Sequence, residues 1–311
     1  MVKKTRQKIL KFLKENPKYV SGEFLSKKLG ISRVSVWKHI RNLQQDGYII
    51  DASQKGYRLI SSPDLLLPYE FPGWEEKIFH FNELDSTMNI ARKMAKEGAK
   101  EWTIIIAETQ TQGKGRLGRK WLSSKGGIYF TVILRPKITP LYAPRINLMA
   151  SIAVARTIRK LFNLKAELKW PNDVLVNGKK ICGILAEMDA EIDKINYVNL
   201  GIGINVNNII SKQEETAISL KEILGKEVDR KSFFYSLLKE LKETQALLNK
   251  ADLLEEWKRL SATLNKIVKV ITINGEIIGK AIDIDAYGAL LIKTSEGSLK
   301  SIFAGDCIHL R

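Results

Sequence analysis

The sequence contains only two cysteines, Cys182 and Cys307, and three histidines. The cysteines are far apart and neither has a Cys-x-x-Cys neighbour, so the sequence supports neither a disulfide framework nor a zinc site. His39, His80 and His309 lack the spacing of a metal site or a catalytic triad, and we interpret them as structural residues. The cysteines and histidines therefore predict neither a metal site nor histidine catalysis.

Long apolar runs are also missing, since no stretch approaches the roughly 18 consecutive apolar residues of a membrane-spanning helix. The first residues, Met-Val-Lys-Lys-Thr-Arg, lead into an amphipathic segment and lack the apolar core of a signal peptide. We therefore expect a cytoplasmic protein with reduced cysteines and no membrane partner.

Acidic residues are scarce relative to basic ones: 34 Asp and Glu stand against 51 Lys and Arg, giving a formal charge of +17. This excess is typical of proteins that bind polyanions or anionic ligands. Residues 1–60 contain 14 basic and four acidic side chains, and residues 109–166 contain 12 basic side chains and no acidic one. A length of 311 residues with 44% hydrophobic residues predicts two or three domains.

Residues 1–60 have the pattern of a winged helix-turn-helix. A second short helix ends at Gly30, and Ser32 is placed to cap a third helix whose apolar spacing buries one stripe. Two strands at 47–50 and 57–60 then flank a turn. Because recognition helices enter the major groove by their N-terminal part, the predicted DNA contacts are Arg33, Ser35, Trp37, Lys38 and the wing residue Lys55. A merely solvated lysine-rich helix is the alternative, but it would not require the helices, the turn and the basic hairpin to coincide.

The polar segment 61–64 contains a proline and predicts a linker. Beyond it, helical patterns at 145–162 and 231–248 mix with short β patterns at 103–107, 128–134, 174–176 and 198–204. After residue 266, short strands are separated by glycine-containing turns, which predicts a small SH3-like β-barrel. We therefore expect an α+β protein of three domains: a winged helix-turn-helix (1–62), a central mixed α/β domain (63–265) and the barrel (266–311).

Residues 110–121, Gln-Thr-Gln-Gly-Lys-Gly-Arg-Leu-Gly-Arg-Lys-Trp, form a basic, glycine-rich loop. Gly113, Gly115 and Gly118 match the dinucleotide motif G-x-G-x-x-G, but no helix pattern follows and no acidic residue occurs between Glu108 and Glu167. A P-loop is excluded because Arg and Lys follow Gly118 where Lys and Ser or Thr are required. The remaining interpretation is a loop whose amides approach an anion while its cations neutralise it. Nucleic acid alone could also compensate this charge, but the glycines favour a small phosphate.

A second segment, Lys-Trp-Pro-Asn-Asp at 169–173, precedes a predicted β-hairpin with an Asn-Gly turn at 177–178. By position alone, the lysines that follow would be a solvated edge. Taken together, however, the motifs resemble those of the biotin-protein ligases, in the bifunctional form that also represses transcription. The resemblance spans essentially the whole chain: the winged helix, Asp-Ser-Thr at 85–87, the loop at 113–121, 169–173 with Lys180 and Gly183, Gly-Ile-Gly-Ile-Asn at 201–205, and the barrel.

The resemblance implies a ligase central domain and a two-step reaction that uses ATP and Mg²⁺. The carboxylate of biotin attacks the α-phosphate of ATP to give biotinyl-5'-AMP, and a lysine of a biotin carboxyl carrier protein then takes the biotinyl group. By resemblance, Arg116 and Lys180 are the catalytic residues that stabilise the negative charge. The implied biotin-binding residues are Ser86, Thr87, Gln110, Lys114, Gly115, Arg116, Lys180, Gly183, Gly201 and Gly203, the last three leaving room for the ligand against the sheet. The implied ATP and adenylate-binding residues are Arg116, Arg119, Lys120, Trp121 (an adenine platform), Asn172, Asp173 and Asn205.

The resemblance also implies that the bound adenylate is a corepressor, which pairs the central sheets of two subunits into a homodimer on operator DNA. Related lipoate ligases are similar in fold, but their Arg-Arg-x-x-Gly-Gly-Gly loop is absent here, so biotin is the expected acid. The chain departs from the family at Met88, where Asn often follows Ser-Thr, and at Lys114, which often is Arg. The alternatives are a non-catalytic winged-helix sensor of a nucleotide-like effector and a ligase for another acid such as lipoate.

Overall fold

The computed structural model describes residues 2–310, and its contacts divide the chain into two compact units, one up to residue 80 and one from residue 81. The three-domain boundaries at residues 62 and 265 remain predictions from the sequence. Among the helices of residues 2–310, none has both the length and the apolar content that crossing a membrane requires.

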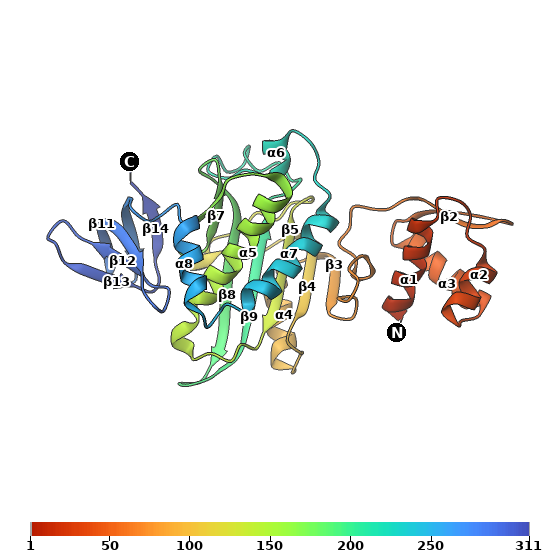
Figure 1. Ribbon diagram of the computed structural model, residues 1–311, viewed down its shortest axis with the longest axis horizontal. Helices are drawn as coiled ribbons and strands as arrows, with labels where there is room; N and C mark the ends of the chain where they lie inside the picture. Colours follow the sequence, from red (N-terminus) through yellow and green to blue (C-terminus); the bar gives the residue numbers. More distant parts are fainter. Residues whose placement is uncertain (1, 311) are drawn as a thin grey trace. The chain divides into compact units, whose positions relative to one another are not determined.

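The N-terminal unit is a winged helix-turn-helix (red in Figure 1). Its elements are α1 (Val2–Glu15), α2 (Gly22–Leu29), α3 (Arg33–Gln45), β1 (Ile49–Ser53), β2 (Gly56–Ser61) and the short 3-10 helix η1 (Pro68–Glu70). The predicted caps are confirmed: Gly30 is left-handed with φ 65°, and the Ser32 hydroxyl accepts a hydrogen bond from the Ser35 amide at 3.1 Å. The predicted apolar stripe of α3 is also confirmed, because Val36 and Ile40 are buried in the core of this unit.

The wing is attached to the helices through Val20, whose backbone exchanges two hydrogen bonds with Tyr57 at 2.8 and 2.9 Å. This contact requires glycine at position 56, where φ is +120° and an added Cβ would lie 2.3 Å from the Val20 carbonyl oxygen. The wing turn therefore falls at residues 54–55, between the two strands.

The second unit is built on a seven-stranded sheet of spatial order β3-β4-β5-β9-β8-β7-β6. Its strands are β3 (Ile78–Leu84), β4 (Thr103–Gln110), β5 (Ile128–Leu134), β6 (Ala166–Lys169), β7 (Asp173–Val176), β8 (Lys179–Ala190) and β9 (Ile195–Ile204). From β4 to β6 every neighbouring pair is antiparallel. The predicted turn at 177–178 joins β7 and β8, with both residues at positive φ.

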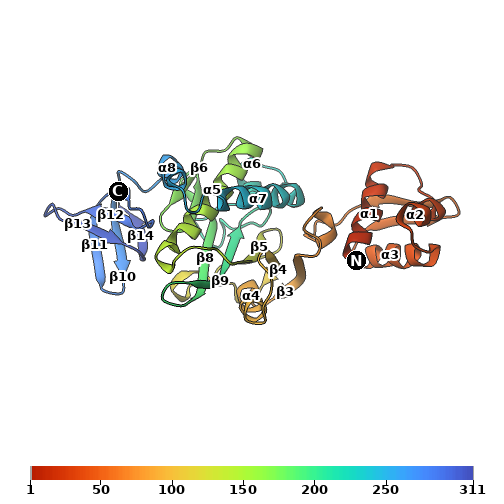
Figure 2. The same cartoon turned by 60° about the horizontal axis from the view of Figure 1, so that its bottom comes forward.

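Helices cover both faces of this sheet (Figure 2). They are α4 (Thr87–Lys96), α5 (Pro144–Phe162), α7 (Arg230–Gln245) and α8 (Ala251–Leu260), while the short α6 (Leu220–Leu224) belongs to the segment that follows β9. On one face α4 buries Ala91 and Ala95 against Ile105 and Ile133. On the other face α7 places Phe234 edge-to-face on Phe130, and α5 packs beside α7. The predicted α+β class is therefore confirmed.

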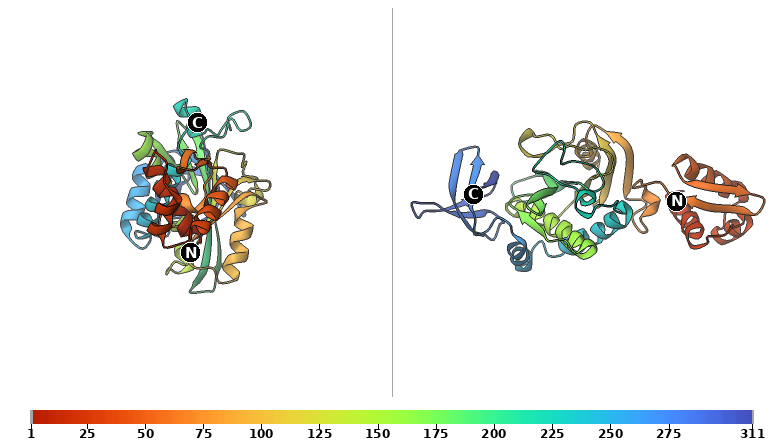
Figure 3. Two further views of the ribbon diagram at one scale, coloured as in Figure 1. Left: turned by 90° about the vertical axis from the view of Figure 1, so that its right-hand side faces the viewer. Right: turned by 90° about the horizontal axis from the view of Figure 1, so that it is seen from above.

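The C-terminal β domain is a five-stranded antiparallel sheet of order β13-β12-β11-β10-β14. Its strands are β10 (Ile267–Thr272), β11 (Gly275–Ile284), β12 (Leu290–Lys293), β13 (Leu299–Ile302) and β14 (Asp306–His309). Its 285–288 turn docks on the central sheet's layer, where Trp170 Nε1 donates to the Gly288 carbonyl at 3.2 Å and Arg145 Nε donates to the Ala286 carbonyl at 2.8 Å. Figure 3 shows this domain (blue) next to the central domain. Its strand β14 contributes residues that line the cavity of the second unit.

Candidate active site

A cavity of about 580 Å³ lies in the second unit and is the size of a small-molecule site. All sixteen small-molecule ligand residues predicted from the sequence line it: Ser86, Thr87, Gln110, Lys114, Gly115, Arg116, Arg119, Lys120, Trp121, Asn172, Asp173, Lys180, Gly183, Gly201, Gly203 and Asn205. The structure thus brings together motifs that are separated by more than 100 residues of sequence. Their roles toward a ligand remain predictions.

One end of the cavity is a network of neutral hydrogen-bonding groups. Gln110 Oε1 accepts from the Thr87 amide at 2.8 Å and from the Thr87 hydroxyl at 3.1 Å. Gln110 Nε2 donates to Ser123 Oγ at 2.9 Å, and Thr131 Oγ1 donates to Thr87 Oγ1 at 2.8 Å. Ser86 is the N-cap of α4 and is fully buried. Because these groups fix one another, this end is suited to orient a neutral polar ring.

The floor of the cavity is a patch of sheet without side chains. Gly183 pairs with Gly203 across β8 and β9, and Gly201 lies two residues before Gly203. All three positions therefore belong to the same face of the sheet. A Cβ at Gly203 would lie 2.3 Å from Trp121 Nε1, and one at Gly183 would lie 2.7 Å from the same indole ring. A Cβ at Gly201 would lie 2.7 Å from Met88 Sδ. The space that we expected for a ligand directly on the sheet is thus occupied by the indole of Trp121 and by Met88.

A β-bulge directs Lys180 into the cavity. Val174 pairs with Cys182, but the next residue, Leu175, pairs with Lys180, so Ile181 is the extra residue on β8. Such a bulge re-aims the side chains beside it. Lys180 accordingly lies on the face of Gly183, where its Nζ is 2.7 Å from Asp173 Oδ1 and 5.3 Å from the centre of the Trp121 ring.

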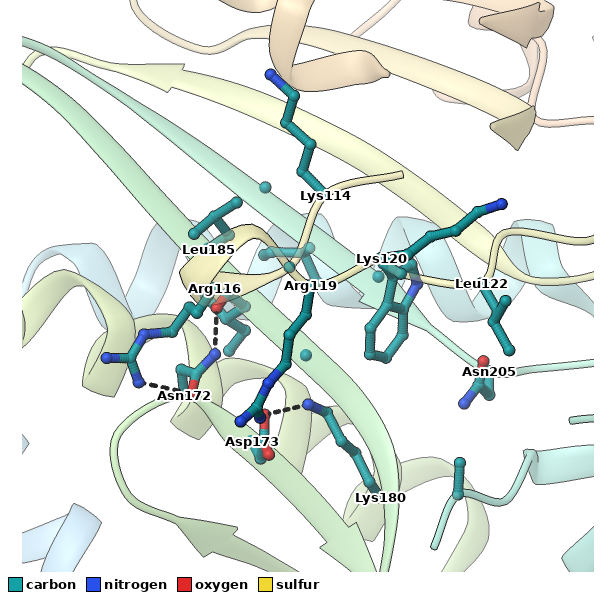
Figure 4. Close-up of a pocket in the computed structure, with 18 of the residues that line it drawn as sticks. Lys114, Arg116, Arg119, Lys120, Leu122, Asn172, Asp173, Lys180, Leu185 and Asn205 are labelled. Carbon is teal, nitrogen blue, oxygen red and sulfur yellow. Dashed lines mark hydrogen bonds and ion pairs between the residues drawn. The ribbon is translucent and has the colours of Figure 1, made fainter. Parts of the chain in front are cut away.

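The basic loop closes on itself like a hairpin. The Trp121 amide donates to the Gly113 carbonyl at 2.8 Å, and the Gly115 amide donates to the Arg119 carbonyl at 2.7 Å. Figure 4 shows that the side chains of Arg116 and Arg119 extend toward Asn172 and Asp173, whereas those of Lys114 and Lys120 point away from them. Only two of the four loop cations therefore converge on the Asn172–Asp173 end.

Arg116 is held by contacts from two domains. Its Nη1 donates to Asn172 Oδ1 at 3.3 Å and to the Gly305 carbonyl at 3.1 Å. Asn172 is fixed in turn, since its Nδ2 donates to the Ile184 carbonyl at 2.7 Å. Burial lowers the pKa of Arg116 below its ordinary value, while the Asp173 and Asp306 charges act in the opposite direction. A partly desolvated guanidinium of this kind is suited to bind an anion.

The C-terminal domain supplies cavity residues that the sequence reasoning missed. Arg119 donates to both carboxylate oxygens of Asp306, which lowers the pKa of that carboxyl. Cys307, Ile308 and His309 follow Asp306 along β14 and also line the cavity. No local pattern marked these residues, because their approach depends on how two domains dock.

The two departures from the family pattern are linked in space. Met88 is buried over Gly201, while Asn89 Oδ1 accepts a hydrogen bond from Lys114 Nζ at 2.6 Å. Asn89 Nδ2 donates to Asp85 Oδ2 at 2.6 Å, and this bond is the main cause that lowers the pKa of Asp85. The Asn that follows Met88 thus ties the loop to the start of α4.

Asn205 directly follows β9 and lines the cavity. Its Oδ1 accepts from Asn208 Nδ2 at 3.0 Å, and its backbone amide donates to the Ile181 carbonyl at 2.9 Å. Beside it, the backbone of Lys180 is bonded to Thr216 and Ile218, so residues 214–218 border the site next to Asn205.

The predicted DNA contacts lie in the N-terminal unit. Arg33, Trp37 and Lys38 are exposed on α3, and Lys55 is exposed in the wing turn. Ser35 is half-buried and uses its amide for the Ser32 cap. Trp37 is 50% exposed and Arg41 lies over its ring at 5.8 Å, so α3 presents an aromatic and basic surface. Contact of these residues with DNA remains a prediction.

The described part of the chain holds no group of three or more His, Cys, Asp or Glu side chains that could bind a metal. The carboxylate of Asp173 and the carboxamide of Asn172 are nevertheless adjacent oxygen donors at the cationic end of the cavity. Mg²⁺ commonly uses one or two carboxylates and completes its shell with substrate phosphates and water. These two residues therefore fit a magnesium–phosphate ligand, although they do not form a complete metal site.

The arrangement joins an end that can orient a neutral ring to an end where Arg116, Arg119 and Lys180 gather positive charge. Such cations stabilise the charge that develops when a carboxylate attacks a phosphate. The site can therefore bind an acid and a nucleotide side by side.

Comparisons with known proteins agree with this geometry. The Biotin/lipoate A/B protein ligase family matches residues 81–205, an HTH domain matches residues 5–58, and the Biotin protein ligase C terminal domain matches residues 263–310. The chain is 36% identical to the bifunctional ligase/repressor BirA of Bacillus subtilis, with 95% of each chain covered, and 32% identical to BirA of Escherichia coli, with 95% of this chain and 94% of the other covered. The structure of the biotin protein ligase from Aquifex aeolicus in complex with biotin and ATP matches 76% of this chain and 99% of that chain, with a TM-score of 0.66 and 32% identity. The chain therefore belongs to the family of bifunctional biotin-protein ligases and transcriptional repressors.

Proposed function

We propose that the protein condenses biotin with ATP to biotinyl-5'-AMP and transfers the biotinyl group to a lysine of a biotin carboxyl carrier protein. The observation that carries this proposal is the convergence of Arg116, Arg119 and Lys180 on one end of a cavity whose other end is the Thr87–Gln110 network. The Aquifex protein of the same fold is described with biotin and ATP bound, which supports the same pair of ligands here.

In the first step, a carboxylate oxygen of biotin attacks the α-phosphorus of ATP and pyrophosphate leaves. Arg116 and Lys180 are the proposed catalytic residues, because both cations line the end of the cavity where the two anions would meet. Arg116 is held by Asn172 and the Gly305 carbonyl, and Lys180 by Asp173. Preorganised charges of this kind reduce the repulsion between reactants without reorganisation during the reaction.

The neutral network and the indole supply binding. We propose that Ser86, Thr87 and Gln110 hydrogen-bond the ring system of biotin and that Trp121 packs on the adenine. Lys114 and Gly115 frame the biotin side of the loop, while Arg119, Lys120, Asn172, Asp173 and Asn205 contact the adenylate. Mg²⁺ would be held by Asp173 and Asn172 together with ATP, where it would neutralise phosphate charge.

In the second step, the amine of the carrier lysine attacks the carbonyl carbon of the mixed anhydride. An amide bond forms, the bond to AMP breaks, and the amine loses a proton to solvent or a nearby base. The cationic end of the cavity stabilises AMP as the leaving group. The carrier must present its biotin-accepting lysine to the mouth of the cavity.

We propose that the winged helix binds operator DNA and that the adenylate promotes a homodimer that occupies two half-sites. The exposed Arg33, Trp37 and Lys38 of α3 and Lys55 of the wing support this proposal. We further propose a cytoplasmic location, in keeping with two free, buried cysteines.

The decisive experiment measures pyrophosphate release from purified protein with ATP and Mg²⁺, with and without biotin. We expect release only when biotin is present, followed by biotinylation when the carrier is added. Lipoate and octanoate serve as competing acids in the same assay. No biotin-dependent release would contradict the ligase function and would favour a sensor, and preference for lipoate or octanoate would reassign the acid.

A further inference from the structure

A buried ion pair lies on the sheet face opposite the cavity. Arg230, the first residue of α7, donates from Nη2 to Glu108 Oε2 at 2.8 Å, and both side chains are at most 5% exposed. Arg230 also donates from Nη1 to the Gly127 carbonyl at 2.7 Å. None of these three residues lines the cavity, so the reaction proposed above does not use them directly.

The two residues that accept hydrogen bonds from Arg230, Glu108 and Gly127, lie on either side of the basic loop in the sequence. Glu108 is near the end of β4, two residues before Gln110, and Gly127 directly precedes β5. All residues of the basic loop lie between them. The segments that contain Glu108 and Gly127 are the two stems of this loop. The stems are also joined by the isolated β-bridge between Gln110 and Ser123. One guanidinium therefore links the two stems from which the loop projects.

The start of α7, which carries Arg230, is itself held in place by hydrogen bonds. Asp229 caps α7 by accepting from the amides of Lys231 and Ser232 at 3.0 and 3.2 Å, which fixes the start of the helix beside Arg230. Val228 exchanges hydrogen bonds with the Asn207 side chain, both at 2.9 Å, just beyond the end of β9. Arg230 is thus presented to the loop stems by a rigid helix start, and the energy of a buried charge pair depends on such exact satisfaction.

We infer that Arg230 is a positioning residue for adenylation, which holds the loop stems in the binding-competent register through Glu108 and Gly127. The inference rests on the proposed function. A loop with loosened stems populates the competent form less often, and the apparent affinity falls by that fraction. Once ligand is bound the geometry is the same, so the turnover number changes little.

The test compares Arg230→Lys and Glu108→Gln with the control Arg156→Lys. The ammonium of lysine cannot span both acceptors, whereas Arg156 makes a similar paired contact with Glu256, Nε to Oε1 at 2.7 Å, between α5 and α8 and away from the loop. We expect the KM for biotin and ATP to rise about 10- to 100-fold in the two test variants, as for misplaced binding groups, with kcat within about threefold. The control should keep the wild-type KM.

A second readout follows the loop directly, because Lys114, Arg116, Arg119 and Lys120 are trypsin sites. Cleavage after these residues, mapped by mass spectrometry, should be faster in the test variants than in the control at matched fractions folded. Equal KM values and equal loop cleavage in test and control variants would overturn the inference, even if all three melt at lower temperature. If Arg230→Lys does not fold, Glu108→Gln decides by the same readings. Absence of biotin-dependent pyrophosphate release from the wild type would instead refute the proposed function.

Discussion

Lys180 and Arg116 reach the same end of the cavity from different elements, one from a bulged strand and one from the glycine-rich loop. Each contacts a fixed partner from the 172–173 segment: Asp173 for Lys180 and Asn172 for Arg116. The two cations are therefore placed before any ligand arrives, which is the arrangement that charge stabilisation in a transition state requires.

Replacing either residue by alanine should lower the rate of adenylation by roughly 10² to 10³, the usual effect of removing one preorganised charge-stabilising donor. The rate of biotin-dependent pyrophosphate release at saturating ATP and biotin measures this change. Lys179→Ala is the matched control for Lys180→Ala, because Lys179 is an exposed neighbour outside the cavity lining. Wild-type rates in both Lys180→Ala and Arg116→Ala would show that the reacting atoms lie elsewhere.

Gly203 tests the floor of the cavity. An alanine Cβ would lie 2.3 Å from Trp121 Nε1, so the indole must move. Overpacking costs about 1–3 kcal/mol, and about 1.4 kcal/mol corresponds to tenfold in affinity. Gly203→Ala should therefore weaken ATP binding about tenfold or more, as measured by calorimetric titration. Gly22→Ala, whose Cβ would make an ordinary 3.4 Å contact in the N-terminal unit, should bind ATP normally. An unchanged affinity of Gly203→Ala for ATP would show that Trp121 does not take part in nucleotide binding.

At the scale of elements, β14 joins the C-terminal sheet to the cavity. His309 on this strand contacts Thr263 Oγ1 through Nε2 at 3.0 Å. Burial, with a further contribution from Lys169 and Lys266, lowers the pKa of His309 to about 4. The neutral imidazole is therefore the form that the folded domain interface accommodates.

This shift makes stability depend on pH. Between pH 6.5, the ordinary histidine value, and pH 4, the unfolded chain binds a proton that the folded chain does not, so stability falls as the pH decreases through this window. His309→Gln should remove that part of the dependence. The melting temperatures of the two proteins should converge or cross as pH is lowered from 7 to 4, relative to their difference at pH 7. If the melting temperatures of the two proteins instead stay a constant difference apart between pH 7 and pH 4, His309 is protonated equally in the folded and unfolded states.

The elements that the sequence predicted well are those with local signals. The caps at Gly30 and Ser32, the turn at 177–178 and strand β5 at 128–134 follow from residue types and spacing over a few positions. The bulge at Ile181 was not predicted, because strict alternation would place Lys180 on the face opposite Gly183. The register of β8 is set by its pairing with β7 and β9, and the spacing of residues within β8 does not predict that pairing.

The candidate site shows the same limit. Its sixteen predicted ligand residues were assigned through motifs that resemble a family, and the structure brings these residues into one cavity. Contacts between distant segments were not foreseen: Arg119 with Asp306, Lys114 with Asn89, and Trp121 over Gly203. These depend on side-chain directions and domain docking, which single-sequence patterns do not specify.

At the scale of the whole molecule, the two compact units separate the proposed activities. The winged helix belongs to the unit that ends at residue 80, and the cavity lies entirely in residues 86–309. A chain starting at residue 63, which keeps all of β3, should therefore adenylate biotin at a rate near that of the full chain and should lose operator binding. Electrophoretic mobility shifts and pyrophosphate release measure the two activities. Operator-specific binding by the shortened chain would contradict the assignment of DNA contacts to α3 and the wing.

DNA binding by the full chain should weaken steeply with salt, because each Lys or Arg that contacts a phosphate releases counterions. Lys38→Ala and Lys55→Ala should each reduce the salt slope by about one. Glu23→Gln, an exposed change on α2 that removes a negative charge, is the control for general charge effects. Equal slopes in wild type and both lysine variants would remove these residues from the DNA interface.

The central claim is that one cavity activates biotin as an adenylate, and the mass of the molecule retained by the protein tests it most directly. The protein is incubated with ATP, biotin and Mg²⁺, freed of unbound ligand, and denatured to release what it holds. We predict biotinyl-5'-AMP, close to one per chain in the wild type and strongly reduced in Arg116→Ala and Lys180→Ala. Recovery of unreacted biotin or of no ligand from the wild type, or of equal adenylate from all three proteins, would contradict the account.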